Sequence, residues 1–182
     1  MLNGRSLKAL SLALLFALSS LTATAVALPD SPAQSPLDFS LRTADGGEIS
    51  SEMLRGDVVV LAFGASYLGR RQVQRVQELA DEFGERDVRV YWVSTESASP
   101  KSKNYATDEQ LRAFARKNGL KVAVLRDPEG TLFKQTRADQ LPSIVILDRT
   151  GSVSGSPVGG FDPEASLVQQ LSGRLNRLLG EK

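Results

Sequence analysis

Four residues near the middle of the chain are the best placed for chemistry: Ser66, Tyr67, Arg70 and Arg71. They follow an apolar run, residues 58–63, which predicts a buried strand that leads directly into a helix. Unpaired amide groups at a helix N-terminus favour an anion, and two arginines would strengthen that preference. A carboxylate or phosphate ligand is one interpretation. The alternative is a pair of solvated arginines beside a tyrosine that packs against a neighbouring loop.

The composition removes the side chains on which several kinds of catalysis depend. The chain has no cysteine, so it has neither a thiolate nucleophile nor dithiol exchange. It has no histidine, which excludes a Ser-His dyad and leaves out the usual zinc and copper ligands. We therefore expect no metal and no cofactor. The net charge of +1 predicts no nucleic-acid partner.

The first 27 residues have the features of a secretory signal peptide. Arg5 and Lys8 precede an apolar run, residues 9–18, and the small residues that follow end in an A-x-A site at 25–27. The run is too short to span a bilayer, which needs roughly 20 apolar residues. We predict cleavage after Ala27 and export to the periplasm or the extracellular space. In the alternative, the segment stays uncleaved and is the only attachment to a membrane.

The remaining chain is predicted to form a flexible leader, residues 28–36, and one α/β domain, residues 37–182. Residues 28–36 are rich in proline and serine. Hydrophobic periodicity and β-branched runs between glycine and proline turns place the elements of the domain. We predict a hairpin at 38–50, a helical turn at 51–55, strands at 58–63, 88–94, 122–125 and 144–148, a returning strand at 152–158, and helices at 70–83, 107–118, 131–136 and after Asp162 and Pro163.

Residues 63–71 read FGASYLGRR and span the turn between the predicted strand and the helix. They resemble, in the same register, the segment F-W-A-T-W-C-x-x-C of thioredoxin-fold proteins, in particular exported TlpA-like reductases and AhpC-TSA-like redoxins. Leu68 and Arg71 stand at the two cysteine positions. Gln74 and Val76 stand where the family tends to have a glutamate and a proline. The resemblance therefore implies the frame of a redox enzyme without its thiols.

A second motif lies at Leu141-Pro142-Ser143, directly before an apolar strand. It is similar to the cis-proline motif of thioredoxin-fold proteins, so the resemblance implies a cis Leu141–Pro142 bond that faces the turn. The alternative is an ordinary trans-proline at the start of a strand. The two motifs and the order of the elements imply a thioredoxin-like fold. That fold has a central mixed β-sheet covered by helices on both faces, here with an N-terminal β-hairpin extension.

The resemblance also implies a mode of binding that needs no cysteine. In the family, a partner chain lies in the groove beside the cis-proline and pairs with the backbone of the preceding residue, here Leu141. The candidate partner-binding residues are Tyr67, Arg70, Arg71, Leu141 and Pro142. The first functional hypothesis is therefore a non-catalytic binding or scaffold module that accepts an extended peptide or protein segment.

Two further hypotheses remain open. The chain could be an enzyme with cysteine-independent chemistry, for which Glu96 and Asp148 are carboxylates that no spacing singles out. It could also belong to a thiol-disulfide oxidoreductase or redoxin family by descent, with the chemistry of that family absent.

Overall fold

The structure, a computed structural model, describes residues 35–160 and 165–180. The predicted signal peptide, residues 1–27, lies outside the described residues, as do Asp162 and Pro163. Of the predicted leader, residues 35 and 36 are described, and both are exposed. Within the described ranges, no helix is long and apolar enough to cross a membrane.

The strands form a small hairpin and a central mixed sheet. Among the described residues they are β1 (Ser40–Arg42), β2 (Glu48–Ser50), β3 (Val58–Gly64), β4 (Val88–Ser94), β5 (Val124–Arg126), β6 (Ser143–Leu147) and β7 (Val158–Gly159). β1 pairs with β2, and the other strands form one sheet in the order β5-β4-β3-β6-β7. β3, β4 and β5 run parallel, whereas β6 is antiparallel to β3. The C-terminal ends of β3, β4 and β5 therefore meet at one edge of the sheet.

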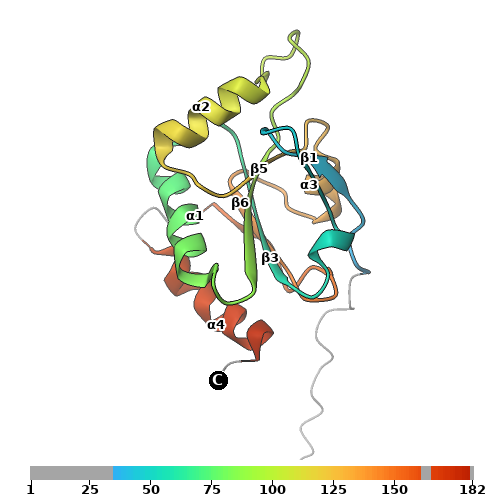
Figure 1. Ribbon diagram of the computed structural model, residues 1–182, viewed down its shortest axis with the longest axis vertical. Helices are drawn as coiled ribbons and strands as arrows, with labels where there is room; N and C mark the ends of the chain where they lie inside the picture. The colour runs from blue at the N-terminus through green and yellow to red at the C-terminus, as the bar shows by residue number, and fades with distance from the viewer. Residues whose placement is uncertain (1–34, 161–164, 181–182) are drawn as a thin grey trace, which may run out of the picture. The chain divides into compact units, whose positions relative to one another are not determined.

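Helices cover both faces of this sheet. They are α1 (Arg70–Phe83), α2 (Asp108–Asn118), α3 (Thr131–Gln135), α4 (Leu167–Leu179) and the 3-10 turn η1 (Glu52–Leu54). The steps from β3 to β4 and from β4 to β5 move in the same direction, so right-handed crossovers place α1 and α2 on one face. α4 packs on that face too, whereas α3 and the hairpin lie on the other (Figure 1).

The core lies in two layers on either side of β3, all of whose residues are buried. Val58, Val60 and Ala62 contact the layer beneath α1, α2 and α4. Val59, Leu61 and Phe63 contact the layer beneath α3 and η1. A strand covered on both faces needs apolar side chains at every position, which explains the continuous run in the sequence.

The predicted α/β architecture and most element boundaries are confirmed. The predicted capping box also forms: the Gln110 N–H donates to Thr107 Oγ1 at 3.1 Å, and the Thr107 N–H donates to Gln110 Oε1 at 2.8 Å. The returning strand predicted at 152–158 was too long, since it consists of β7 and an isolated bridge at Val153. Gly155 between them has a φ of +65°, which is incompatible with an extended strand.

Two other boundaries also differ from the prediction. The strand predicted at 122–125 is β5, which starts at Val124 and includes Arg126. The last helix begins at Leu167, with Ser166 as its N-cap, so its start was wrongly predicted.

Candidate functional site

The candidate site lies at the edge of the sheet where β3 ends and β6 begins. Phe63 at the end of β3 pairs with Ser143, the first residue of β6. This register brings the turn after β3 to the same edge as Leu141 and Pro142. The Leu141–Pro142 peptide bond is cis. The sequence motifs that lie far apart in the chain are therefore neighbours at one sheet edge.

Leu68, which stands at the first of the two cysteine positions of the family, packs against the core. Leu68 is partly buried and packs against the layer beneath α1. A Cβ atom on Gly64 would lie 2.4 Å from Cζ2 of Trp92 and 2.9 Å from Cδ1 of Leu68. The indole of Trp92 and the Leu68 side chain thus occupy the space that a side chain at position 64 would need. The turn is filled with apolar contacts where a redox site would present a thiol.

The outer surface of the turn carries Tyr67, Arg70 and Arg71, all exposed. Tyr67 is 72% exposed, so the alternative in which it packs against a neighbouring loop is wrong. α1 begins at Arg70 with Gly69 as its N-cap, and it has no side-chain cap and no acid in its first turn. Such a helix start can accept an anion.

Beneath the turn lies Glu96, which is 3% exposed. Its carboxylate accepts hydrogen bonds from the backbone N–H of Ser66 at 3.0 Å and from Ser66 Oγ at 2.5 Å. Ser94 Oγ, at the end of β4, donates to the same carboxylate at 3.1 Å. Glu96 thus ties the turn after β3 to the end of the neighbouring strand. These three hydrogen bonds position the turn.

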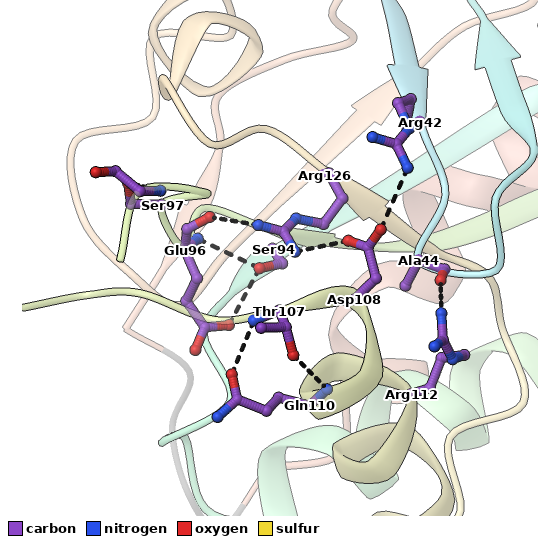
Figure 2. A network of polar contacts seen from close by, with 11 residues as sticks. Arg42, Ala44, Ser94, Glu96, Ser97, Thr107, Asp108, Gln110, Arg112 and Arg126 are labelled. Atoms are coloured by element: carbon purple, nitrogen blue, oxygen red, sulfur yellow. Dashed lines mark hydrogen bonds and ion pairs between the residues drawn. The ribbon is translucent and has the colours of Figure 1, made fainter. Parts of the chain in front are cut away.

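A chain of polar contacts runs from Glu96 toward the hairpin (Figure 2). Arg126, which is 8% exposed, donates to the backbone oxygen of Glu96 at 3.3 Å and to Oδ1 of Asp108 at 2.8 Å. Arg42 of β1 donates to the other oxygen of Asp108 at 3.3 Å. Asp108 is held at the first turn of α2 by the capping box that precedes it. The network therefore joins β1, β5, α2 and the loop after β4.

Asp148, the other carboxylate considered for catalysis, closes a tight turn. Its Oδ1 atom accepts hydrogen bonds from the N–H and the hydroxyl of Thr150 and from the N–H of Ser152. These contacts satisfy the carboxylate locally. Within the described residues, no group of three or more acidic side chains could hold a metal ion.

Two shifted pKa values belong to groups away from this edge. Burial raises the pKa of Tyr91; the charge of Arg89 opposes this rise, and the charge of Asp57 adds to it. Burial and then the neighbouring Arg177 lower the pKa of Arg174, a residue of α4. A raised tyrosine pKa leaves Tyr91 protonated at neutral pH. Neither group provides an acid or a base to the turn.

Sequence reasoning predicted the turn and the proline motif, but it missed the network behind them. The structure brings Leu68 and Arg71 to the start of α1, and Leu141 and Pro142 to the same sheet edge. Arg126 and Asp108 were not predicted as site residues. One sequence feature could have indicated the network. Glu96 comes shortly after one apolar strand and Arg126 ends the next, and the C-terminal ends of neighbouring parallel strands bring polar residues together.

The sequence comparisons agree with this geometry. The family model for the AhpC/TSA family matches residues 32–156, which is most of the described domain. The chain belongs to the AhpC/TSA family. A search of the curated proteins found no significant match. Since this member has no cysteine, thiol redox chemistry is impossible for the chain alone.

Solved structures similar to this AhpC/TSA member are thioredoxin-like proteins. A thiol:disulfide interchange protein of the thioredoxin family from Chlorobium tepidum is 16% identical, with a TM-score of 0.62, covering 80% of this chain and 99% of its own. A secreted Mycobacterium tuberculosis disulfide oxidoreductase homologous to E. coli DsbE is 18% identical, with a TM-score of 0.57 and coverages of 77% and 96%. The exposed lipoprotein thioredoxin Etrx1 from Streptococcus pneumoniae is 25% identical, with a TM-score of 0.60 and coverages of 75% and 99%. These likenesses establish the thioredoxin-like fold.

Proposed function

We propose that this chain is an exported, non-catalytic binding module that accepts an extended segment of a partner polypeptide beside Tyr67 and Leu141. One observation carries the proposal: the exposed side chain of Tyr67 lies at the same sheet edge as Leu141, whose backbone N–H and C=O have no hydrogen-bond partner among the described residues. Tyr67 and Met53 are the large hydrophobic side chains that are exposed in the described part of the chain. Of the two, Tyr67 lies on the turn at this edge. An exposed tyrosine gives a partner apolar area together with a hydroxyl group.

The backbone of Leu141 supports the same proposal. Neither its N–H nor its C=O makes a hydrogen bond with the residues that the structure describes. The next carbonyl, that of Pro142, already accepts from the N–H of Gly160 at 3.2 Å. An extended segment that reaches this edge can therefore pair both of its backbone groups with Leu141. Such strand addition supplies affinity through the main chain and specificity through alternate side chains.

The absence of thiol chemistry fits this role. Leu68 contributes a core contact, and Glu96 holds the turn from below through the backbone N–H and hydroxyl of Ser66. Because the turn is already held in place, less conformational entropy is lost when a partner binds to it than if the turn were flexible. Arg70, exposed at the start of α1, provides a positive charge for an acidic side chain of the bound segment.

Export is part of the proposal. It rests on the basic, apolar and small-residue pattern of residues 1–27. Two of the similar structures belong to a secreted protein and an exposed lipoprotein, which supports the same location for this chain. The test is the N-terminal sequence of the protein recovered from outside the cytoplasm. A mature N-terminus at Leu28 is expected, and a full-length chain in the cytoplasm would contradict export.

The binding proposal is tested with a library of displayed peptides selected on the purified protein. Tyr67→Ala should weaken the selected peptides about tenfold or more, because exposed aromatic residues dominate binding energies at such surfaces. Met53→Ala is the matched control, since Met53 is 64% exposed but lies on η1. Equal affinity of the Tyr67→Ala variant and the parent would place binding elsewhere and contradict the proposal.

The backbone part of the proposal needs a separate measurement. Each amide of a selected peptide is methylated in turn, which removes one N–H without altering the protein. Pairing with Leu141 predicts that affinity falls at one position of the peptide, because Leu141 has a single free carbonyl and the next carbonyl, that of Pro142, already accepts from Gly160. Uniform sensitivity, or none at all, would contradict pairing with Leu141.

A further inference from the structure

A cavity lies where the polar network that starts at Glu96 reaches the hairpin. Its volume is about 400 Å³, within the range of roughly 300–1,000 Å³ that is typical of small-molecule sites. Three parts of the chain form its walls: β1, the loop after β4 together with the start of α2, and the end of β5. We call it the Arg126 cavity, and its lining includes Leu41, Arg42, Tyr105, Asp108, Arg126 and Pro128.

Contacts between these parts of the chain hold the walls of the cavity in place. Thr43 bridges Leu125, which fixes the hairpin against β5. Ser97 bridges Tyr105, so the loop after β4 is closed on itself, and the capping box at Thr107 fixes the start of α2. Because the cavity is preformed, a ligand loses little affinity in ordering its walls.

The side chain of Arg126, which is only 8% exposed, lines this cavity with hydrogen-bond donors that the protein does not use. A guanidinium group has five N–H donors. One of them donates to Asp108 at 2.8 Å and another to the Glu96 carbonyl at 3.3 Å. Five less two leaves three donors without an acceptor among the described residues. Buried donors without acceptors are costly, so an acceptor group on a ligand in the cavity would stabilise Arg126.

The charged side chains of the lining favour an anion. Arg42 and Arg126 are its two cations, and Asp108 is the one carboxylate among the described residues that line it. Asp108 lies between the two guanidinium groups and accepts from Arg42 at 3.3 Å and from Arg126 at 2.8 Å (Figure 2). Two positive charges and one negative charge leave a net charge of +1, which a single carboxylate on a ligand would balance.

The rest of the lining includes apolar surface for the body of such a ligand. Leu41, Ala106 and Pro128 contribute aliphatic groups, and Tyr105 contributes an aromatic ring. Leu41, Tyr105 and Pro128 are each half-buried, so part of their surface remains available for contact. An inorganic anion would leave this surface uncovered, whereas an organic anion would use both the charged and the apolar part of the lining.

We propose that the Arg126 cavity binds a small organic carboxylate. The carboxylate accepts hydrogen bonds from Arg126 and Arg42, and the apolar body packs against Leu41, Tyr105 and Pro128. The site is distinct from the proposed peptide-binding edge, because Arg126 ends β5, two strands away from β3 in the sheet. The two proposals therefore rest on different residues and can fail separately.

The test titrates phenylacetate into the purified protein and follows its binding by NMR. Phenylacetamide, which has the same body without the charge, and acetate, which has the charge without the body, are the controls. Phenylacetate should bind about tenfold more tightly than the amide, because hydrogen bonds to charged groups are the stronger ones. It should also bind more tightly than acetate, because it buries more apolar surface. The signals of the Arg126 Nε–H and the Tyr105 amide should shift, whereas that of the Tyr67 amide should not.

Three variants decide where phenylacetate binds. Arg42→Gln should weaken its binding about threefold to fivefold, as expected for a partly exposed charge pair, and should leave the stability of the fold unchanged because Arg42 is 71% exposed. Arg89→Gln is the matched control and should have no effect, although Arg89 is likewise exposed and paired with one carboxylate, that of Asp57, at 3.0 Å. Tyr67→Ala should leave binding unchanged, which separates this proposal from the proposed function.

Four results would overturn the inference. They are absence of phenylacetate binding at millimolar concentration, equal affinity for phenylacetate and phenylacetamide, an unshifted Arg126 signal at saturation, and equal affinities of the Arg42→Gln and Arg89→Gln variants.

Discussion

The candidate site has an exposed layer, whose groups could contact a partner, and a buried layer, whose groups hold the turn in place. The exposed layer consists of Tyr67, Arg70 and the backbone of Leu141. The buried layer consists of Trp92, Glu96 and the residues that they contact. The Trp92 ring packs against Gly64, and the Glu96 carboxylate accepts hydrogen bonds from Ser66. In a thiol enzyme the reactive group would lie between these layers. Here that position belongs to the buried layer, because Leu68 packs into the core.

The difference shows that the turn is well ordered without thiols. Side chains from β4 and the loop after it now fix the turn, and only its outer surface is available to a partner. We therefore expect substitutions in the buried layer to change stability strongly and those in the exposed layer to change binding alone.

Glu96→Ala should have the largest effect on stability. The substitution removes a buried carboxylate that accepts three hydrogen bonds, and it leaves the Ser66 and Ser94 donors without their partner. We expect a loss of about 3 kcal/mol in the free energy of unfolding, measured by urea denaturation. Glu85→Ala, at an exposed glutamate, is the control and should change it by less than about 0.5 kcal/mol. Equal effects of the two variants would show that the buried layer does not hold the turn.

Gly64→Ala should have the next largest effect. Its Cβ would meet the six-membered ring of Trp92 at 2.4 Å, and that ring is buried in the core and cannot turn away. Overpacking of this kind typically costs about 1–3 kcal/mol. In a Trp92→Phe background the clashing ring atoms are absent, so the same substitution should cost much less. Additive effects in the double variant would contradict the packing described here.

The sequence predicted the fold well because its strongest signals are local. The run at 58–63, the capping box at Thr107 and Gln110, and the turn glycines each specify one element without help from the rest of the chain. Pro142 and the turn at 63–71 could be related in space only through the family resemblance, since no local rule connects them. The candidate residues Tyr67, Arg70, Arg71, Leu141 and Pro142 remain a prediction until a partner is tested.

The buried contacts could not be predicted in the same way. Whether Glu96 faces solvent or the turn depends on how far the loop after β4 folds back, and residues 95–106 have no periodicity that determines it. Arg126 lies one residue beyond the predicted end of its strand, and its partner Asp108 comes from a helix 18 positions earlier in the chain. Such pairs are set by the packing of whole elements, which a single sequence does not encode in any local pattern.

The smallest net effect on stability is expected when cysteines are placed at both positions that hold cysteine in the family, 68 and 71. Leu68→Cys removes part of a core side chain, which should cost about 1–2 kcal/mol. Closing a loop of so few residues by a disulfide should return roughly 2 kcal/mol. The double variant Leu68→Cys with Arg71→Cys should therefore unfold close to the parent when oxidised and more easily when reduced.

This double variant also tests the boundary between the two layers. Positions 68 and 71 span the start of α1 at a separation of three residues, a spacing that allows an internal disulfide in a turn of this kind. Thiol titration after mild oxidation should find no free thiol in the double variant, whereas each single variant should retain one. The thiol at position 68 replaces a core contact, so its single variant should react more slowly with a thiol reagent than Arg71→Cys, whose parent side chain is exposed. Equal reactivity at the two positions would show that position 68 belongs to the exposed layer, and the comparison between the layers would then fail at the residue on which it depends most.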